Sequence, residues 1–266
     1  MKILWIPLES EATGAGTVKL LAILHCARPV LFANADPQYP YSIGGSAFVV
    51  KFRDRHFVVS AKHVLRAGGF DASQVRIQYR PDSNKFLPLA QVYWLQGDDQ
   101  DDTDQFDLAI WSMDELAIDA EVFGDYLPYN LLGIDSATLY GGKSHYIFRG
   151  YPEMLRTVNY ELRDFQLGSI SGRAVYVGKA PSSFTHEIAL VNDGTLSSAQ
   201  GLSGAPVFQV NNDENSLYST EAFAGVLIRG NASRAYFLEH QRIIGALIQI
   251  CGGGFIEAGS MEPQPK

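Results

Sequence analysis

The chain has 266 residues, of which 46% are hydrophobic and 19% are charged, and its formal net charge is −8. These proportions are typical of a globular protein that builds a sizeable core without metal or disulfide support. The negative charge and the lack of clustered Lys and Arg disfavour nucleic acid, whose phosphates require such clusters. No run of residues approaches the length of a membrane-spanning helix. We therefore expect neither nucleic acid nor a membrane as partner.

Cysteine usage and the start of the chain indicate the cellular compartment. Only Cys26 and Cys251 are present, too few for a disulfide framework, although a single pair stays open. The first residues, MKILWIPLES, place one lysine before a short apolar run that Pro7 interrupts, unlike a secretory signal. The expected location is the cytoplasm.

A first group of short β-rich runs occupies the N-terminal half. Gly, Pro, Asn and Asp separate the runs, as is typical of an all-β sandwich or barrel. The expected strands are 46–50, 56–60, 75–79, 92–95 and 108–111. Several aspartates between positions 98 and 104 are interpreted as a solvated loop, with calcium coordination or attraction of basic substrates as alternatives.

A second group of runs follows a looser stretch at 114–142. The expected strands are 145–148, 158–162, 173–177, 187–191, 205–210 and 222–228. Two groups of about six strands fit two successive barrels, at 1–123 with the N-terminal segment and at 124–266, which together form one domain.

The end of the chain predicts a C-terminal amphipathic helix. Ile244, Leu247, Ile248 and Cys251 fall at the spacing i, i+3, i+4 and i+7, and glycines at 252–254 stop the pattern. This helix belongs to the second strand group.

A serine among glycines is the most informative feature of the second group. In AQGLSGAPVF, Ser203 stands between Gly201 and Gly204, directly before an apolar strand. Glycines permit a tight turn that can direct consecutive backbone N–H groups into one concavity. A serine hydroxyl becomes a good nucleophile only when a neighbouring base removes its proton. The sequence therefore has to offer a base.

His63 and Asp107 provide a base and a group to orient it. His63 follows the expected strand 56–60, and Asp107 opens the expected strand at 108–111. A carboxylate beside the histidine would fix its tautomer and stabilise the imidazolium. Each residue alone is more often a packing, cap or turn residue. Their order, with two in the first strand group and Ser203 in the second, predicts a cleft between two barrels.

Three segments resemble the motifs of the trypsin-like serine peptidase family. VVSAKHV is similar to its histidine motif, FDLAI to its aspartate motif and GLSGAPV to its serine motif, over residues 44–250. FDLAI and FRGYP resemble the bacterial stress-protease branch in particular. The resemblance implies an all-β fold of two six-stranded antiparallel β-barrels with a C-terminal α-helix. It also implies hydrolysis of polypeptide substrates through an acyl-enzyme, without cofactor or metal, and the roles given above follow this family's template.

The resemblance also implies further site residues. The backbone N–H groups of Gly201 and Ser203 would form the oxyanion hole, and Ile228, Arg229 and Gly230 would lie along an extended substrate.

Ser197 matches the base of the primary specificity pocket. An acid is absent there, so a preference for Arg or Lys before the scissile bond is not expected. Arg229 and Arg234 near this pocket leave an acidic preference open.

Four residues depart from the family pattern. Leu202 replaces an aspartate that pairs with a freed N-terminus, so activation by N-terminal cleavage is not expected. Ala205 replaces a glycine and Lys62 replaces an alanine. Ile228 replaces a serine that supports the aspartate of the family's Ser–His–Asp triad. These changes leave open an inactive or partner-activated module that binds peptides as a scaffold. An α/β-hydrolase esterase fits less well, because Ala205 breaks its GxSxG pattern and the acid and histidine precede the serine.

The remaining histidines lack metal-ligand spacing and are interpreted as structural. They are His56, His145, His186 and His240. The sequon that begins at Asn231 is interpreted as a turn.

Overall fold

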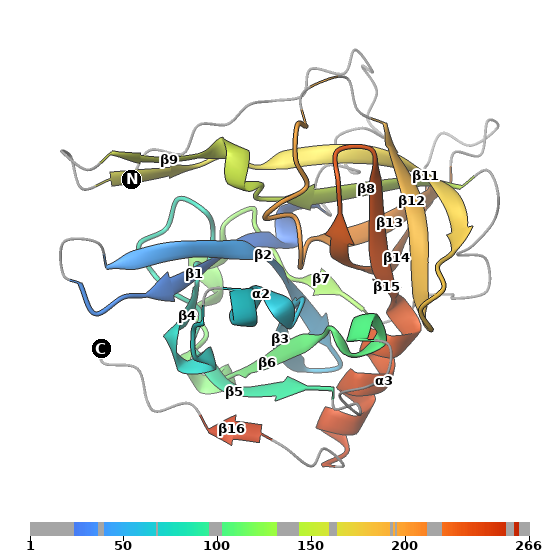
Figure 1. Cartoon of the computed structure of the whole chain (residues 1–266). Helices are drawn as coiled ribbons and strands as arrows, with labels where there is room; N and C mark the ends of the chain where they lie inside the picture. Colours follow the sequence, from blue (N-terminus) through green and yellow to red (C-terminus); the bar gives the residue numbers. More distant parts are fainter. Residues whose placement is uncertain are drawn as a thin grey trace.

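The computed structural model describes residues 24–36, 40–67, 69–95, 103–131, 144–159, 164–191, 194, 196–211, 220–253 and 258–260. These residues form a mostly β protein with one open sheet, one closed barrel and a C-terminal helix, as Figure 1 shows. None of the helices in these ranges combines the length and the apolar character needed to span a membrane.

The first half of the chain forms most of an open, eight-stranded sheet. The order is β16-β5-β6-β3-β2-β1-β4, and β7 pairs in parallel with β2. The strands are β1 (Ala27–Ala33), β2 (Tyr41–Phe52), β3 (Arg55–Ser60), β4 (Val75–Ile77), β5 (Leu89–Trp94), β6 (Ala109–Met113), β7 (Tyr129–Asn130) and β16 (Ala258–Ser260). The expected six-stranded barrel is therefore found here as a larger open sheet, because β7 and β16 join it and β4 is only three residues long.

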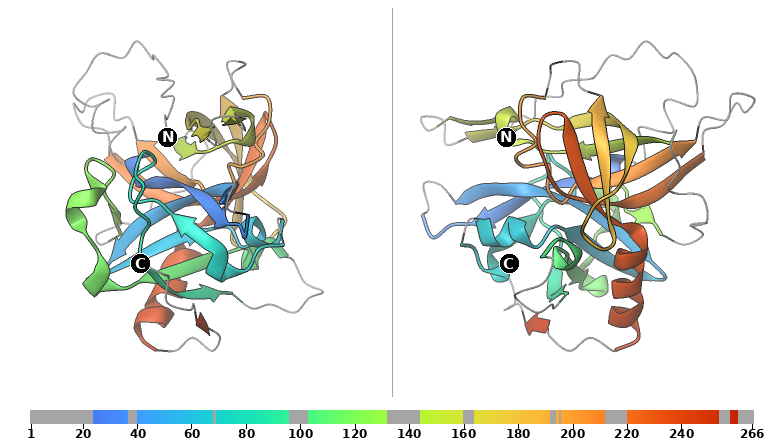
Figure 2. Two further views of the ribbon diagram at one scale, coloured as in Figure 1. Left: turned by 90° about the vertical axis from the view of Figure 1, so that its left-hand side faces the viewer. Right: turned by 45° about the vertical axis from the view of Figure 1, so that its right-hand side comes forward.

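The second half closes into a six-stranded antiparallel barrel, as predicted. The order around the barrel is β11-β12-β15-β14-β13-β8. The strands are β8 (His145–Gly150), β11 (Ile170–Lys179), β12 (Thr185–Val191), β13 (Pro206–Asn211), β14 (Thr220–Gly230) and β15 (Arg234–Glu239). A ribbon of β9 (Arg156–Asn159) and β10 (Asp164–Leu167) lies between β8 and β11 in sequence and projects from the barrel (Figure 2). The expected strand 158–162 overlaps β9 only at its first residues, and 160–162 lie outside the described residues.

Short helical segments connect the strands. They are α2 (His63–Ala67) and the 3-10 turns η1 (Leu24–Cys26), η2 (Ala72–Gln74), η3 (Thr103–Phe106), η4 (Glu115–Ala117), η5 (Ala120–Phe123) and η7 (Glu153–Leu155). Three of them, α2, η3 and η7, contribute to the site described below.

Strand β1 was not predicted from the sequence, and its composition explains why. It contains Arg28 and Pro29, residues that are uncommon in buried strands. The pairing of β1 with β2 shifts register between Pro29 and Leu31, so the proline occupies an irregularity of the ladder.

The Arg28 side chain is fully buried and is held by main-chain carbonyls. Its Nε donates to the Tyr79 oxygen at 2.8 Å, and Nη1 donates to the His25 and Ala27 oxygens at 2.5 and 2.9 Å. Nη2 donates to the carbonyl of Tyr126. Burial lowers the pKa of Arg28 to about 10. The guanidinium thus joins β1 to segments some 50 and 100 positions further along the chain.

Helix α3 (His240–Cys251) confirms the predicted C-terminal helix, but the predicted buried face is partly wrong. Its buried apolar residues are Ile243, Ala246, Leu247 and Ile250, again at the spacing i, i+3, i+4 and i+7. Ile248, expected inside, is 47% exposed. The real stripe starts one residue earlier than Ile244, and the helix packs against β14 and β15.

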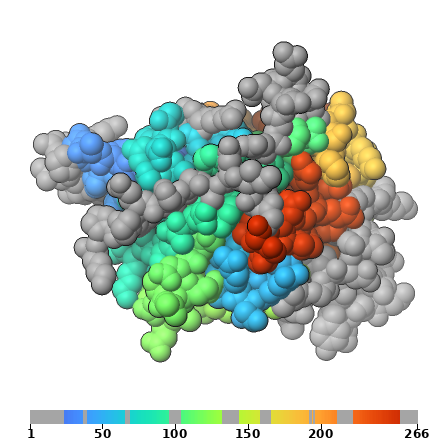
Figure 3. Space-filling view, turned by 90° about the horizontal axis from the view of Figure 1, so that it is seen from below, coloured from blue at the N-terminus to red at the C-terminus, as the bar shows by residue number. Residues whose placement is uncertain are grey.

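The largest apolar cluster contains residues from both halves of the chain. Ile243 and Leu247 of α3 belong to it together with Leu108 and Trp111, which flank or lie in β6, and Phe48 of β2. From below, α3 lies beside the atoms of the first half (Figure 3). The helix therefore fastens the second half to the open sheet. Cys26 and Cys251 are both free thiols, so the open question of their pairing is answered.

Candidate active site

Adjacent strand ends bring His63 and Asp107 together. Strands β3 and β6 are paired, with Ser60 opposite Ala109. His63 begins α2 just after β3, and Asp107 stands between η3 and β6. One carboxylate oxygen, Oδ2, lies 2.6 Å from His63 Nδ1, and the other, Oδ1, accepts the His63 backbone N–H at 2.8 Å. Both oxygens of Asp107 are thus used by one histidine.

The electrostatics of this pair favour the protonated imidazole. Burial by itself lowers the pKa of His63, but the hydrogen bond and the charge of Asp107, together with the charge of Asp104, outweigh burial and leave the pKa raised. The His63 side chain is 44% exposed and that of Asp107 14%. The imidazole is therefore held on its Nδ1 side while its other side remains accessible.

Ser203 lies against the end of the first sheet, close to α2. Its carbonyl accepts the backbone N–H of Ser46 at 2.8 Å, and the Ser46 carbonyl accepts the Ser60 hydroxyl at 2.7 Å. A Cβ built on Gly45 would lie 2.9 Å from both the Ser203 oxygen and the Val64 side chain. Ser203 is therefore a near neighbour of the residue that follows His63.

The Ser203 hydroxyl points toward strand β14. Its Oγ donates to the Ile228 carbonyl at 3.3 Å. Within the described part of the chain, hydrogen bonds do not join Ser203 to His63. The structure thus pairs His63 with Asp107 and places the serine beside them with its hydroxyl on a different acceptor.

The backbone around Ser203, residues 199–205, is called the serine turn below. Gly201 and Gly204 both have φ +88°, a conformation that favours glycine. A Cβ on Gly204 would overlap the carbonyl of Ser46, and one on Gly201 would lie 2.5 Å from Arg156 Nη2 and 2.7 Å from the Tyr151 oxygen. The prediction that these glycines permit a tight turn is confirmed.

The N–H groups of Gly201 and Ser203, like that of Ala199 at the start of the serine turn, have no acceptor among the described residues. The carbonyl that precedes the first, on Gln200, accepts the Glu153 N–H at 2.8 Å. The carbonyl that precedes the second, on Leu202, accepts the Ala205 N–H at 2.9 Å. Since N–H and C=O point in opposite directions across a planar peptide, each N–H is directed away from its fixed carbonyl.

The predicted substrate strand lies at the end of β14. Opposite Val226, strand β13 begins at Pro206, so β13 does not extend along residues 228–230. On the other edge Arg229 pairs with Tyr236 and Gly230 with Ala235. Within the described chain one edge of this segment therefore lacks a strand partner, as addition of an extended peptide requires.

Each of the predicted specificity residues contacts a different partner. The Ser197 hydroxyl contacts the Met154 sulfur at 3.4 Å. Arg229 forms an ion pair with Asp104 at 2.7 Å, and Arg234 forms one with Glu187 at 2.5 Å. Both arginines, which left an acidic preference open, are thus already paired with carboxylates.

The four departures have structural explanations. Leu202 is 2% exposed and belongs to the apolar cluster of the barrel, as does Ala205. The Lys62 amine donates to the Leu95 carbonyl at 3.3 Å and faces a cavity of about 260 Å³ beside α2. The Ile228 side chain is buried, and Asp107 receives both of its hydrogen bonds from His63 within the described residues.

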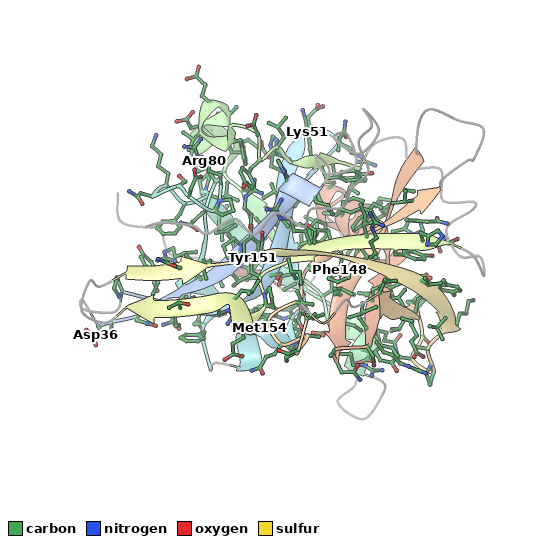
Figure 4. All side chains as sticks on the ribbon, turned by 90° about the horizontal axis from the view of Figure 1, so that it is seen from above. Asp36, Lys51, Arg80, Phe148, Tyr151 and Met154 are labelled. Atoms are coloured by element: carbon green, nitrogen blue, oxygen red, sulfur yellow. The ribbon has the colours of Figure 1, made fainter. Side chains whose placement is uncertain are left out.

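Two residues that hold the serine turn were missed by sequence reasoning: Ser46 and Arg156. Ser46 Oγ bonds both Gly201 and Tyr151, and Arg156 bonds the carbonyls of Tyr151 and Gly44. Tyr151 and Met154, labelled in Figure 4, mark this region. The only available signal was the position of Arg156 shortly after FRGYP and that of Ser46 directly after the two glycines of β2.

The other histidines and the sequon occupy ordinary positions. His56 pairs with Glu115 at 2.9 Å, and His186 and His240 are buried. The Asn231 side chain accepts three hydrogen bonds in a turn, as predicted. The aspartates at 98–102 lie outside the described residues, which contain no cluster of three metal-ligating side chains.

Taken together, the site contains a base, a carboxylate that orients it, a serine hydroxyl and two N–H donors. These groups come from both halves of the chain and meet where the barrel packs on the open sheet. Comparison with known proteins assigns no family: neither a protein-family model nor a curated protein matches the chain.

Proposed function

We propose that this protein is a serine endopeptidase of the trypsin-like kind, with its open sheet and its closed barrel in the places of that family's two β-barrels. The observation that carries the proposal is the double hydrogen bond of Asp107 to His63, beside a serine on a glycine-rich turn. An orienting carboxylate, a base and a serine are the parts that acyl transfer requires. The closed barrel and the open sheet support the architecture that the sequence resemblance implies.

The chemistry begins with a rotation of the Ser203 hydroxyl from the Ile228 carbonyl to His63 Nε2. His63 accepts the hydroxyl proton while Oγ attacks the carbonyl carbon of the peptide, and Asp107 stays ionised beside the imidazolium. The oxygen of the tetrahedral intermediate accepts hydrogen bonds from the Gly201 and Ser203 N–H groups. One such donor is worth about 3 kcal/mol in comparable sites.

The intermediate then loses the amine. The C–N bond breaks, His63 gives its proton to the leaving nitrogen, and an ester remains on Ser203. A water molecule attacks that ester while His63 again accepts a proton. His63 then gives this proton to Ser203 Oγ as the ester C–O bond breaks, so the carboxylic acid leaves, the hydroxyl is restored and no co-reactant other than water is consumed.

The substrate would be an extended polypeptide. The partner-less edge of residues 228–230 supports binding of the peptide as an added strand. The absence of an acid at Ser197, and the pairing of Arg229 and Arg234 with carboxylates, support cleavage beside uncharged residues.

The second candidate is a module that is inactive or becomes active only with a partner. The observation in its favour is the Ser203 hydroxyl, which donates to Ile228 and not to His63. In that case the site would bind peptides without cleaving them until a partner protein changed the rotamer.

Labelling of the purified protein with a fluorophosphonate tests both candidates without knowledge of the substrate. Wild-type protein should be labelled at Ser203, as mapped by mass spectrometry, and Ser203→Ala should not. Ser233→Ala, a serine in an exposed turn, is the matched control and should label like wild type. Labelling that requires added peptides or cell extract would favour the partner-activated module. Absence of labelling under every condition would exclude the peptidase.

A further inference from the structure

A single residue of the first sheet contacts both sides of the serine turn. Ser46 Oγ donates to the Gly201 carbonyl at 2.8 Å and accepts the Tyr151 N–H at 2.9 Å. Its own N–H donates to the Ser203 carbonyl at 2.8 Å. Ser46 is fully buried in the structure, so water does not compete for these bonds. The residues on either side of Leu202 are thus both bonded to Ser46.

Arg156, at the start of β9, supports the same turn from the other side. Its Nη1 donates to the Ile43 carbonyl at 3.1 Å, and Nη2 donates to the Gly44 and Tyr151 carbonyls at 2.6 and 3.2 Å. The Nη2 atom also fills the space that a Cβ on Gly201 would occupy. Burial lowers the pKa of Arg156, a shift that Glu153 opposes.

Residues 151–153 connect both side chains to the N–H of Gly201. Ser46 bonds the N–H of Tyr151 and Arg156 bonds its carbonyl, which fixes this segment. Two residues later, the Glu153 N–H donates to the Gln200 carbonyl. That bond sets the orientation of the peptide plane whose other end is the Gly201 N–H.

We propose that Ser46 and Arg156 are positioning residues that hold the Gly201 N–H toward the oxyanion of the reaction. The proposal rests on the proposed function. Leu202 occupies the position before the nucleophile and is buried in the apolar cluster of the barrel, so this position offers no charge for a freed N-terminus. The hydrogen bonds of Ser46 and Arg156 supply the support that such an ion pair would give. The turn is therefore set by the folded chain itself.

The test compares Ser46→Ala and Arg156→Lys with two matched controls, Ser42→Ala and Arg76→Lys. Ser42 is a half-buried serine of β2 whose hydroxyl contacts Asn34, and Arg76 is a half-buried arginine of β4 that bonds local carbonyls. The first readout is the rate of fluorophosphonate labelling. We expect Ser46→Ala to slow it by on the order of 100-fold, because one oxyanion donor loses its position. Arg156→Lys keeps the positive charge but loses the planar guanidinium with its several N–H donors, and it should slow labelling by about 10-fold.

Two further readouts separate positioning from a general structural role. The pKa of His63, followed by NMR, should stay unchanged in Ser46→Ala, because neither bond of Asp107 to His63 is touched. With a cleavable peptide, kcat should fall while KM stays within about threefold.

The outcomes are distinct. Equal labelling of wild type, Ser46→Ala and Arg156→Lys would overturn the positioning proposal while leaving the peptidase intact. Absence of labelling in wild type would instead overturn the proposed function. If Ser46→Ala does not fold, Arg156→Lys decides: a labelling rate like that of Arg76→Lys would refute the proposal.

Discussion

Replacement of Asp107 by Asn tests the arrangement of the predicted base most directly. One oxygen of Asp107 accepts from His63 Nδ1 at 2.6 Å and the other accepts from the His63 backbone N–H at 2.8 Å. Asn offers only one oxygen. If that oxygen faces the backbone N–H, the amide NH₂ faces Nδ1 and forces the proton onto Nε2. The histidine then cannot accept the proton of Ser203.

The expected loss of rate in Asp107→Asn has two causes, the lost charge and the changed tautomer of His63. Two unit charges about 4 Å apart interact by ~4 kcal/mol at an effective dielectric constant of about 20. Because the His63 side chain is 44% exposed, solvent screening reduces this to roughly 2 kcal/mol, or about 30-fold in rate. The wrong tautomer accounts for the remainder of a total loss on the order of 10⁴.

The pH dependence of the labelling rate tests the same arrangement independently. In wild type the labelling rate should rise with pH through the raised pKa of His63, above the ordinary 6.5, since only the neutral imidazole accepts a proton. Asp107→Asn removes the hydrogen bond and charge that raise this pKa but keeps the burial that lowers it. The NMR titration midpoint of His63 should therefore move to lower pH.

Asp104→Asn is the matched control for the charge alone. Asp104 also raises the pKa of His63, through its charge, and it pairs with Arg229. Its loss should lower the rate by less than about fivefold and leave the tautomer unchanged. Labelling of Asp107→Asn within tenfold of wild type, with the proton still on Nδ1, would refute the reasoning.

Three further predictions concern the pocket and the fold. Ser197→Asp should create a preference of about 10- to 100-fold for Arg or Lys before the scissile bond, measured by mapping cleaved termini; an unchanged profile would show that Ser197 lies outside the pocket. Arg28→Met should leave buried carbonyls unpaired and cost ~3 kcal/mol, a fall in melting temperature of roughly 6–12 °C by calorimetry. Leu247→Ala should destabilise by about 2–5 kcal/mol in urea, whereas Ile248→Ala should stay within about 0.5 kcal/mol, and equal effects would contradict the observed buried face of α3.

Local patterns predicted the strands that have ordinary composition and missed those that do not. The runs at 46–50 and 222–228 lie inside β2 and β14. Strand β1 was missed because Arg28 and Pro29 are normally signs of a loop, and only the folded chain provides the carbonyls that satisfy the guanidinium. Periodicity likewise found helix α3 but not its rotation, which depends on β14 and β15.

Some residues of the candidate site could be predicted from the sequence, and others could not. His63, Asp107 and Ser203 could be singled out because each follows or precedes a recognisable strand. Ser46 and Arg156 could not, since their hydrogen bonds to Gly201 and to Gly44 join residues more than 100 positions apart, which only the folded chain brings together. The open first sheet was not predicted because its last strand, β16, comes from the end of the chain.

The apolar cluster shared by the two halves of the chain makes their stability inseparable. Residues of β2 and of α3 lose their packing together, so unfolding of either half exposes the other. A compound bound between the halves, for example at Ser203, therefore stabilises the whole chain against unfolding rather than one half alone. The melting temperature should therefore rise when a peptide binds between the halves, and a thermal-shift screen of peptides can find ligands before any cleavage is observed.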